Sequence, residues 1–191
     1  MGKQLLQTLN SIDTDALKQT VREVSSDPAK GLVKFEVTTS WTDGPKSETA
    51  VTAWEIGGQR IERDFTIQID EPPELLGTNT APNPQELLMA AVNGCMLAGY
   101  VVGCSLKGIE LESLTIETHA ELDLRGFLGI DKTVKPGYDE IHQTVRIKGN
   151  GTAEQFREVH ETVMASSPNY FNMTHPITMH PQLIVEQLVV D

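Results

Sequence analysis

The chain has 191 residues, within the range of one domain with a sizeable core. It carries 15 Lys and Arg against 27 Asp and Glu, a net charge of -12, with no dense basic cluster, so we do not expect nucleic-acid binding. Its two cysteines argue against a disulfide-stapled secreted scaffold, and residues 1–25 lack the apolar run of a signal peptide, so we expect a cytoplasmic protein.

The first third of the chain predicts a short helix and three strands. Residues 13–25 have an amphipathic helical pattern within an N-terminal extension (residues 1–30), and Asp27-Pro28 ends it. Strands are expected at 33–39, 49–56 and 59–70 from alternating apolar and polar positions. In the third strand Arg63 occupies the face that otherwise carries apolar side chains, which is the most informative anomaly in this half of the chain.

A long apolar helix is predicted from residue 84 to about residue 107. Asn83 can cap it, Pro84 suits its first position, Glu86 can complete a capping box, and Gly108 ends it. Residues 87–106 are uncharged over the length of a membrane span, but polar and glycine residues interrupt them, so we interpret the helix as the buried centre of a soluble protein and expect no membrane partner. Two rows of small residues would let other backbones approach: Ala90, Gly94, Ala98 and Cys95, Gly99, Gly103.

After Gly108 the pattern predicts strands at 113–124 and 141–148, a helix from Thr152 to about Met164, a break at Ser167-Pro168 and a final strand at 183–190. Strands, a long helix, more strands and a helix in one chain of 191 residues predict a single domain, residues 1–191, of the α+β class.

Cys95 lies within the predicted central helix. A cysteine there is either a small core residue or a reactive thiol. Cys104 lies nine positions on, roughly 900° around the helix and about 13 Å along its axis, so the two cannot form a disulfide through this helix. We therefore interpret Cys104 as structural.

Residues 83–95, Asn-Pro-Gln-Glu-Leu-Leu-Met-Ala-Ala-Val-Asn-Gly-Cys, resemble the central-helix motif of the osmotically-inducible-protein-C (OsmC) and organic-hydroperoxide-resistance superfamily. In that motif a cysteine follows eleven residues after the helix-opening proline. Asp70-Glu71-Pro72-Pro73, Pro136-Gly137-Tyr138 and Ser167-Pro168 fit the same order, so the resemblance spans about residues 32–190.

The resemblance implies an OsmC-like fold, with antiparallel sheets around a long buried helix in an intertwined homodimer whose active sites lie at the subunit interface. In the peroxidase members the first cysteine reduces an organic hydroperoxide as a thiolate and becomes a sulfenic acid. A second cysteine then forms a disulfide that an external thiol reduces, and an arginine and a glutamate assist the first thiol. No cofactor is implied.

The sequence departs from that pattern twice. Gln85 stands where the family has its glutamate, and the adjacent Glu86 either replaces it or serves only as the helix cap. Ser167 stands where the family has its second cysteine, and serine cannot form the disulfide. Arg63 is our candidate for the arginine, and Arg60 is the alternative. A third interpretation is that Arg63 has no role in the site and is a sheet-edge side chain whose charged end reaches solvent.

The five histidines do not have metal-ligand spacing, and we expect no metal site. His175 follows Ser167-Pro168 closely, so we expect the fold to bring it near Cys95. Tyr170, Phe171 and Met173 either wall the same pocket or belong to the core.

Two functions remain open. The first is a one-cysteine thiol peroxidase that acts on small organic hydroperoxides with an external thiol. The second is a small-molecule-binding protein that keeps the fold after its catalytic residues have been lost. A sulfenic acid trapped at Cys95 would discriminate between them.

Overall fold

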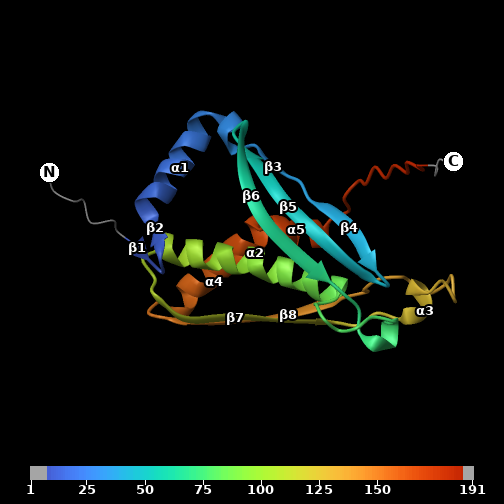
Figure 1. Ribbon diagram of the computed structural model, residues 1–191. Coiled ribbons are helices and arrows are strands. Elements are labelled where there is room, and N and C mark those ends of the chain that lie inside the picture. The colour runs from blue at the N-terminus through green and yellow to red at the C-terminus, as the bar shows by residue number, and fades with distance from the viewer. Residues whose placement is uncertain (1–7, 187–191) are drawn as a thin grey trace.

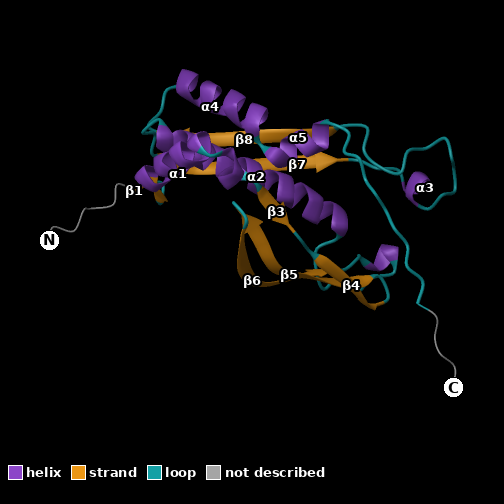
Figure 2. Cartoon of the chain, turned by 90° about the horizontal axis from the view of Figure 1, so that it is seen from above, coloured by secondary structure: helices purple, strands orange, loops and turns teal. Residues whose placement is uncertain are grey.

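The computed structural model of the chain describes residues 8–186. Its longest helix, α2, lies between two antiparallel sheets in Figure 1, with the β3–β6 sheet on one side and the β7–β8 pair on the other. Helices α4 and α5 pack against α2, and Figure 2 shows α4 and the β3–β6 sheet on opposite sides of α2. The fold is therefore of the predicted α+β class.

The N-terminal segment forms a small hairpin followed by a helix. Strands β1 (Thr8–Leu9) and β2 (Ile12–Asp13) pair antiparallel, and α1 (Thr14–Ser26) begins after Asp13, whose carboxylate accepts the amide protons of Asp15 and Ala16. The side chain of Asn10 donates to Ser105 Oγ and to the carbonyl of Ile109, tying this hairpin to the end of α2. A 3-10 turn, η1 (Pro28–Gly31), follows α1 and confirms that the helix ends at Asp27-Pro28.

Four strands form the first sheet. Strands β3 (Val33–Phe35) and β4 (Thr38–Asp43) pair with one edge of β5 (Lys46–Ile56), and β6 (Gln59–Ile69) pairs with the other edge. The predicted strand at 33–39 is thus divided, because Glu36 and Val37 make no strand pairing between β3 and β4. The sheet leaves many large apolar side chains exposed: Phe35, Val37, Trp41, Phe65 and Ile67.

A loop fastened by one carboxylate leads from the sheet to α2. Asp70 is fully buried and accepts hydrogen bonds from the backbone of Glu71, Thr78 and Thr80 and from both threonine hydroxyls. These bonds hold the pKa of Asp70 far below its usual value, chiefly through the Thr80 amide. The loop contains the 3-10 turn η2 (Pro73–Leu75).

Helix α2 (Pro84–Leu106) has the predicted capping box between Asn83 and Glu86. By length and composition alone it could cross a membrane. In the single chain, burial is confined to one stripe rather than extending all round, and the stripe comprises Val92, Met96, Tyr100, Cys104 and Ser105. Because β7, α4 and α5 pack on that side, the opposite face, with Ala90, Gly94 and Ala98, stays exposed.

The second sheet pairs β7 (Leu111–Ala120) with β8 (Ile141–Gly149). The strand predicted at 113–124 ends at Ala120, because Asp123 caps a short helix, α3 (Leu124–Phe127). Helix α4 (Ala153–Ser166) has the predicted capping box of Thr152 and Gln155, and α5 (Pro168–Thr174) follows Ser167.

The strand predicted at 183–190 is not formed in its described part. Residues 183–186 have no regular secondary structure, and residues 187–190 lie outside the described residues. The apolar side chains of this segment, Leu183, Ile184 and Val185, are exposed. A strand needs a paired neighbour, and residues 183–186 pair with no strand of the described chain.

The core lies between α2, α4 and the β7–β8 pair. Tyr100 is buried at its centre, its hydroxyl lies 2.5 Å from Nδ1 of His160, and burial raises the pKa of Tyr100 to about 12. Val159 and Val163 of α4 complete the packing.

Candidate functional site

Cys95 lies on the side of α2 that faces α4 and α5. The glycines of the same row allow the helices to approach closely: a methyl group at Gly99 would lie 3.2 Å from Val163 Cγ2, and one at Gly103 would lie 3.1 Å from Val159 Cγ1. One of the two predicted small-residue rows is thus a helix–helix contact. Cys95 is partly exposed, unlike the buried Cys104.

Within the described residues, the hydroxyl of Ser167 donates a hydrogen bond to the Cys95 sulfur. Its hydroxyl oxygen lies 3.4 Å from Sγ although 72 positions separate the residues. Ser167 is 6% exposed and serves as both the C-cap of α4 and the N-cap of α5, where its Oγ accepts the amide proton of Tyr170 at 3.5 Å. The helix junction therefore holds a hydroxyl donor against the sulfur, as predicted from the family geometry.

A polar network surrounds Asn93, two residues before Cys95, where α2 meets the second sheet. Thr118 Oγ1 donates to Asn93 Oδ1 at 2.7 Å, and Gln143 Nε2 donates to the same oxygen at 3.1 Å. Asn93 Nδ2 is 3.4 Å from the carbonyl oxygen of Ile116. These uncharged groups satisfy one another in a partly buried position and fix the segment of α2 that carries Cys95.

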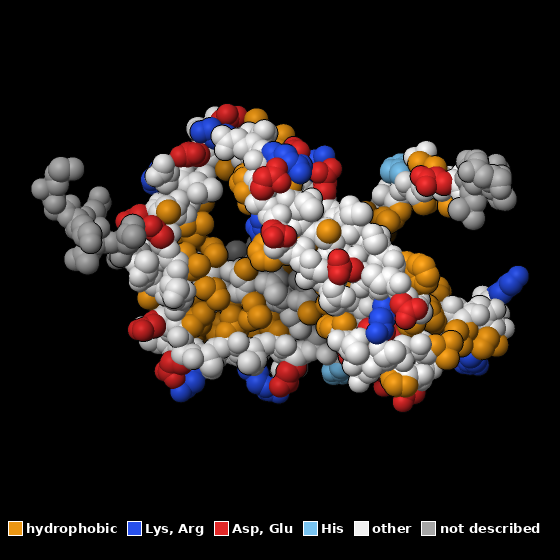
Figure 3. Space-filling view, in the orientation of Figure 1, with side chains coloured by type: hydrophobic (Ala, Val, Ile, Leu, Met, Phe, Trp, Pro, Cys, Tyr) orange, Lys and Arg blue, Asp and Glu red, His pale blue; other side chains and the backbone are white. Residues whose placement is uncertain are grey.

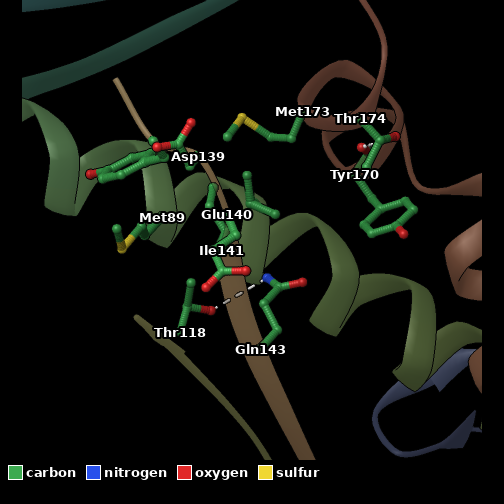
Figure 4. Close-up of a pocket in the computed structure, with 11 residues that line it drawn as sticks. Met89, Thr118, Asp139, Glu140, Ile141, Gln143, Tyr170, Met173 and Thr174 are labelled. Atoms are coloured by element: carbon green, nitrogen blue, oxygen red, sulfur yellow. Dashed lines mark hydrogen bonds between the residues drawn. The ribbon is translucent and has the colours of Figure 1, made fainter. Parts of the chain in front are cut away.

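A cavity of about 420 Å³ opens beside this network. Figure 4 shows side chains from α2, β7, β8 and α5 converging on it, with Tyr170 on one side and Asp139 on the other. Its apolar lining comprises Met89, Val92, Tyr138, Ile141, Tyr170 and Met173. Burial raises the pKa of Tyr138. Cys95 and Ser167 do not line the cavity, but Val92 lies about one helical turn before Cys95 and the Tyr170 amide contacts the Ser167 hydroxyl, so the cavity lies within about one helical turn of Cys95.

Two of the predicted residues on α2 cannot touch Cys95 of their own chain. Gln85 and Glu86 precede Cys95 by ten and nine positions, which places them about 15 and 13 Å away along the helix axis. The Glu86 carboxylate accepts the amide proton of Asn83 at 2.9 Å, so its role as a cap is confirmed. Gln85 is exposed. Any binding role for either residue at a thiol needs the Cys95 of a second copy.

His175 ends α5 at an exposed position. Its ring stacks on Phe171 at 4.1 Å, and its Nδ1 lies 3.0 Å from Thr174 Oγ1. No described contact joins it to Cys95, so its proximity to the thiol stays a prediction. Within residues 8–186, no group of three or more His, Cys, Asp and Glu side chains is placed to hold a metal ion.

Arg63 lies in β6, with its guanidinium 4.7 Å from the centre of the Phe65 ring. It lines a cavity of about 190 Å³ on the first sheet with Phe35, Val37 and Trp54 among its neighbours. Its described contacts lie in the sheet, and its approach to a Cys95 sulfur stays a prediction. Arg60 is paired instead with Glu62 at 2.9 Å and Glu36 at 3.8 Å.

Cys104 is fully buried, and desolvation raises the pKa of its thiol. A raised pKa leaves less of the reactive thiolate at neutral pH. Its place in the core agrees with the structural role predicted for it.

The polar lining of the cavity was missed by our sequence analysis. Thr118 and Gln143 occupy inward positions of β7 and β8 that otherwise carry apolar side chains, a signal of the same kind as Arg63. Asp139 and Glu140 lie in the irregular segment before β8, where no alternating pattern predicts the direction of their side chains. Among the other lining residues, Met89, Val92 and Tyr138 belong to motifs quoted above. Of the three residues predicted to wall a pocket or belong to the core, Tyr170 and Met173 line this cavity and Phe171 does not.

The arrangement defines a class: an α+β protein with one accessible cysteine on a long helix, next to an apolar cavity. The chain belongs to the OsmC family, because the model for OsmC-like protein matches residues 77–181, more than half of it. No curated protein sequence matches.

Two solved structures show the same fold. An OsmC-like protein from Mycoplasma pneumoniae is similar with a TM-score of 0.58 and 16% identity, covering 74% of this chain and 87% of that chain. An OsmC-like protein of unknown function from Vibrio cholerae is similar with a TM-score of 0.52 and 13% identity, covering 72% of this chain and 91% of that chain.

Proposed function

We propose that this OsmC-like protein is a one-cysteine thiol peroxidase that reduces organic hydroperoxides at Cys95 and uses an external thiol, such as the cytoplasm supplies, as reductant. The observation that carries the proposal is the partly exposed Cys95, whose sulfur lies 3.4 Å from the Ser167 hydroxyl and about one helical turn from the Val92 wall of a cavity of about 420 Å³. The Ser167 hydroxyl supplies a hydrogen-bond donor at the sulfur that would react. The cavity can hold the organic part of the peroxide.

In the first step, the Cys95 thiolate attacks the distal oxygen of the hydroperoxide, the O–O bond breaks, and the alkoxide leaves and takes up a proton to become an alcohol. The peroxide gains two electrons, and the sulfur loses two and becomes a sulfenic acid. Because Ser167 cannot supply a sulfur, an external thiol then forms a mixed disulfide with Cys95 and releases water. A second thiol attacks the outer sulfur and restores the thiolate.

We propose further that the functional unit is a homodimer. The face of α2 with Ala90, Gly94 and Ala98 is uncovered in the single chain, and a methyl group at Gly94 would meet nothing within 4 Å. Figure 3 shows a hollow lined with hydrophobic side chains between α1 and the first sheet. A second copy would cover these surfaces, and could bring its Arg63 and Gln85 to Cys95.

The test is to expose the reduced protein to one equivalent of cumene hydroperoxide in the presence of a 1,3-diketone that traps sulfenic acids. We expect one diketone adduct at Cys95, located by mass spectrometry of peptides, and one equivalent of cumyl alcohol. Cys104→Ser should keep both products, whereas Cys95→Ser should lose both.

If Cys95 reacts no faster than free cysteine, the peroxidase proposal fails. The second function, a small-molecule-binding protein without catalysis, would then explain the cavity.

A further inference from the structure

We infer that the cavity between α2, β8 and α5 selects hydroperoxides whose remote end is neutral or cationic and disfavours those that end in a carboxylate. The inference rests on the proposed function, because it names the substrate class of the same site. It follows from the direction of the cavity and from the charges at its far end.

The cavity has a reactive end and a remote end. Tyr170 belongs to the reactive end, because its amide contacts the Ser167 hydroxyl that bonds to the Cys95 sulfur. Asp139 lies on the opposite side in Figure 4, in the segment just before β8. A substrate whose peroxide group reaches Cys95 therefore points the rest of its body toward Asp139 and Glu140.

The middle of the cavity is apolar or uncharged. Met89, Val92, Ile141 and Met173 supply the apolar walls, and Thr118 and Gln143 are already hydrogen-bonded to Asn93 or to each other. A charged group placed here would lose its hydration without gaining an ionic partner. The organic body of the substrate must therefore be uncharged, and a charge is tolerated only at the remote end.

The remote end carries net negative charge. Among the described residues that line the cavity, Asp139 and Glu140 are the charged ones, and none is Lys, Arg or His. Lys135 forms an ion pair with Asp139 and offsets it. Among the described residues the ion-pair partner of Glu140 is His142, at 2.9 Å, and no Lys or Arg is paired with Glu140. Glu140 is thus the carboxylate that a substrate carboxylate would meet without a Lys or Arg partner beside it, in a chain of net charge -12.

The expected discrimination is modest, because both carboxylates are exposed at the rim and salt screens them. Charge pairs in such positions change binding by about two- to five-fold. The effect should weaken as ionic strength rises, which separates it from exclusion by shape.

The experiment compares three hydroperoxides that share one alkyl chain and differ at the remote end: a methyl ester, a trimethylammonium group and a carboxylate. We expect Cys95 oxidation by the carboxylate to be about two- to five-fold slower than by the ester at low salt, and oxidation by the cation to be at least as fast. In Glu140→Gln the difference between carboxylate and ester should shrink. Glu112→Gln, which makes the same change in charge on the outer side of β7 where Glu112 pairs with Lys148, should leave it unchanged.

The corresponding alcohols cannot oxidise a thiol, so their binding tests the charge selectivity of the cavity independently of the peroxidase proposal. Their binding to the Cys95→Ser variant is measured by displacement of a neutral fluorescent probe, and the same order of affinities is expected. If no hydroperoxide oxidises Cys95 but the alcohols keep this order, the selectivity stands and the peroxidase function does not. Equal binding of ester and carboxylate alcohols, or equal effects of the Glu140 and Glu112 variants, overturns the selectivity.

Discussion

Ser167 joins three structural roles at one position, since it ends α4, caps α5 and donates to the sulfur of Cys95. Its proximity to Cys95 could be predicted only through the family motif, because nothing in the local sequence connects positions 72 residues apart. The caps themselves could be predicted from residue type alone, as Asn83 and Thr152 show, because a capping box is a local pattern.

Replacing Ser167 by cysteine should create a resolving thiol. Because the serine oxygen already lies 3.4 Å from the Cys95 sulfur, a sulfenic acid at Cys95 should condense with the new thiol and lose water to form a disulfide. We expect a peptide cross-link between positions 95 and 167 after one equivalent of hydroperoxide, detected by mass without reductant. Ser166→Cys is the matched control, because the Ser166 hydroxyl bonds to the Thr162 carbonyl instead. A Ser167→Cys variant that stays reduced under oxidising conditions would contradict the site geometry.

The elements that the sequence predicted best are those with local signals. Helix α2 matches its predicted range because Asn83, Pro84 and Gly108 mark both ends, and α1 matches because Asp13 and Pro28 do. The failures depend on tertiary contacts. The break between β3 and β4 and the end of β7 at Ala120 occur where pairing stops, and the exposure of one side of α2 depends on how many elements cover it. The periodicity of apolar residues predicts neither where strand pairing stops nor which side of a helix is left uncovered.

The loop between β6 and α2 should depend on the ionised carboxylate of Asp70. Asp70→Asn should lower the free energy of unfolding at pH 7, because an amide oxygen accepts fewer of the hydrogen bonds from Thr78 and Thr80 and its NH₂ group opposes their donors. Since the folded state depresses the pKa of Asp70, its contribution is full above the unfolded value of about 4 and is lost as the pH falls below that value.

Urea unfolding at pH 7, 5 and 3 tests this. The difference between the wild-type protein and the Asn variant should be largest at pH 7 and 5 and should shrink at pH 3. Asp64→Asn, at an exposed position of β6, is the control for the loss of one charge. A difference that is the same at all three pH values would show that ionisation of Asp70 does not stabilise the loop.

At the scale of the molecule, the single chain leaves more apolar surface exposed than a stable monomer tolerates easily. Phe35, Trp41 and Phe65 are 75%, 74% and 55% exposed on the first sheet, and the tail at 183–185 adds further apolar side chains. The acidic net charge of -12 opposes nonspecific association, so an interface must be specific and apolar. These observations favour association of two copies, and the uncovered face of α2 with Ala90, Gly94 and Ala98 is the helix surface that we predict takes part in it.

Sedimentation velocity at micromolar concentration should therefore give twice the 21.0 kDa mass of one chain. Gly94→Leu should weaken the dimer, because a leucine on the uncovered row would overfill a close helix contact. Overfilling costs about 1–3 kcal/mol, and this corresponds to roughly a five- to 150-fold higher dissociation constant.

Thr144→Leu adds a comparable apolar side chain to the exposed face of β8 and should leave the dimer unchanged. Circular dichroism should show that both variants fold, because Gly94 has open space around it in the single chain and Thr144 is exposed. A wild-type chain that sediments as a folded monomer, or a Gly94→Leu variant that dimerises as tightly as the wild type, would contradict the assembly through this face.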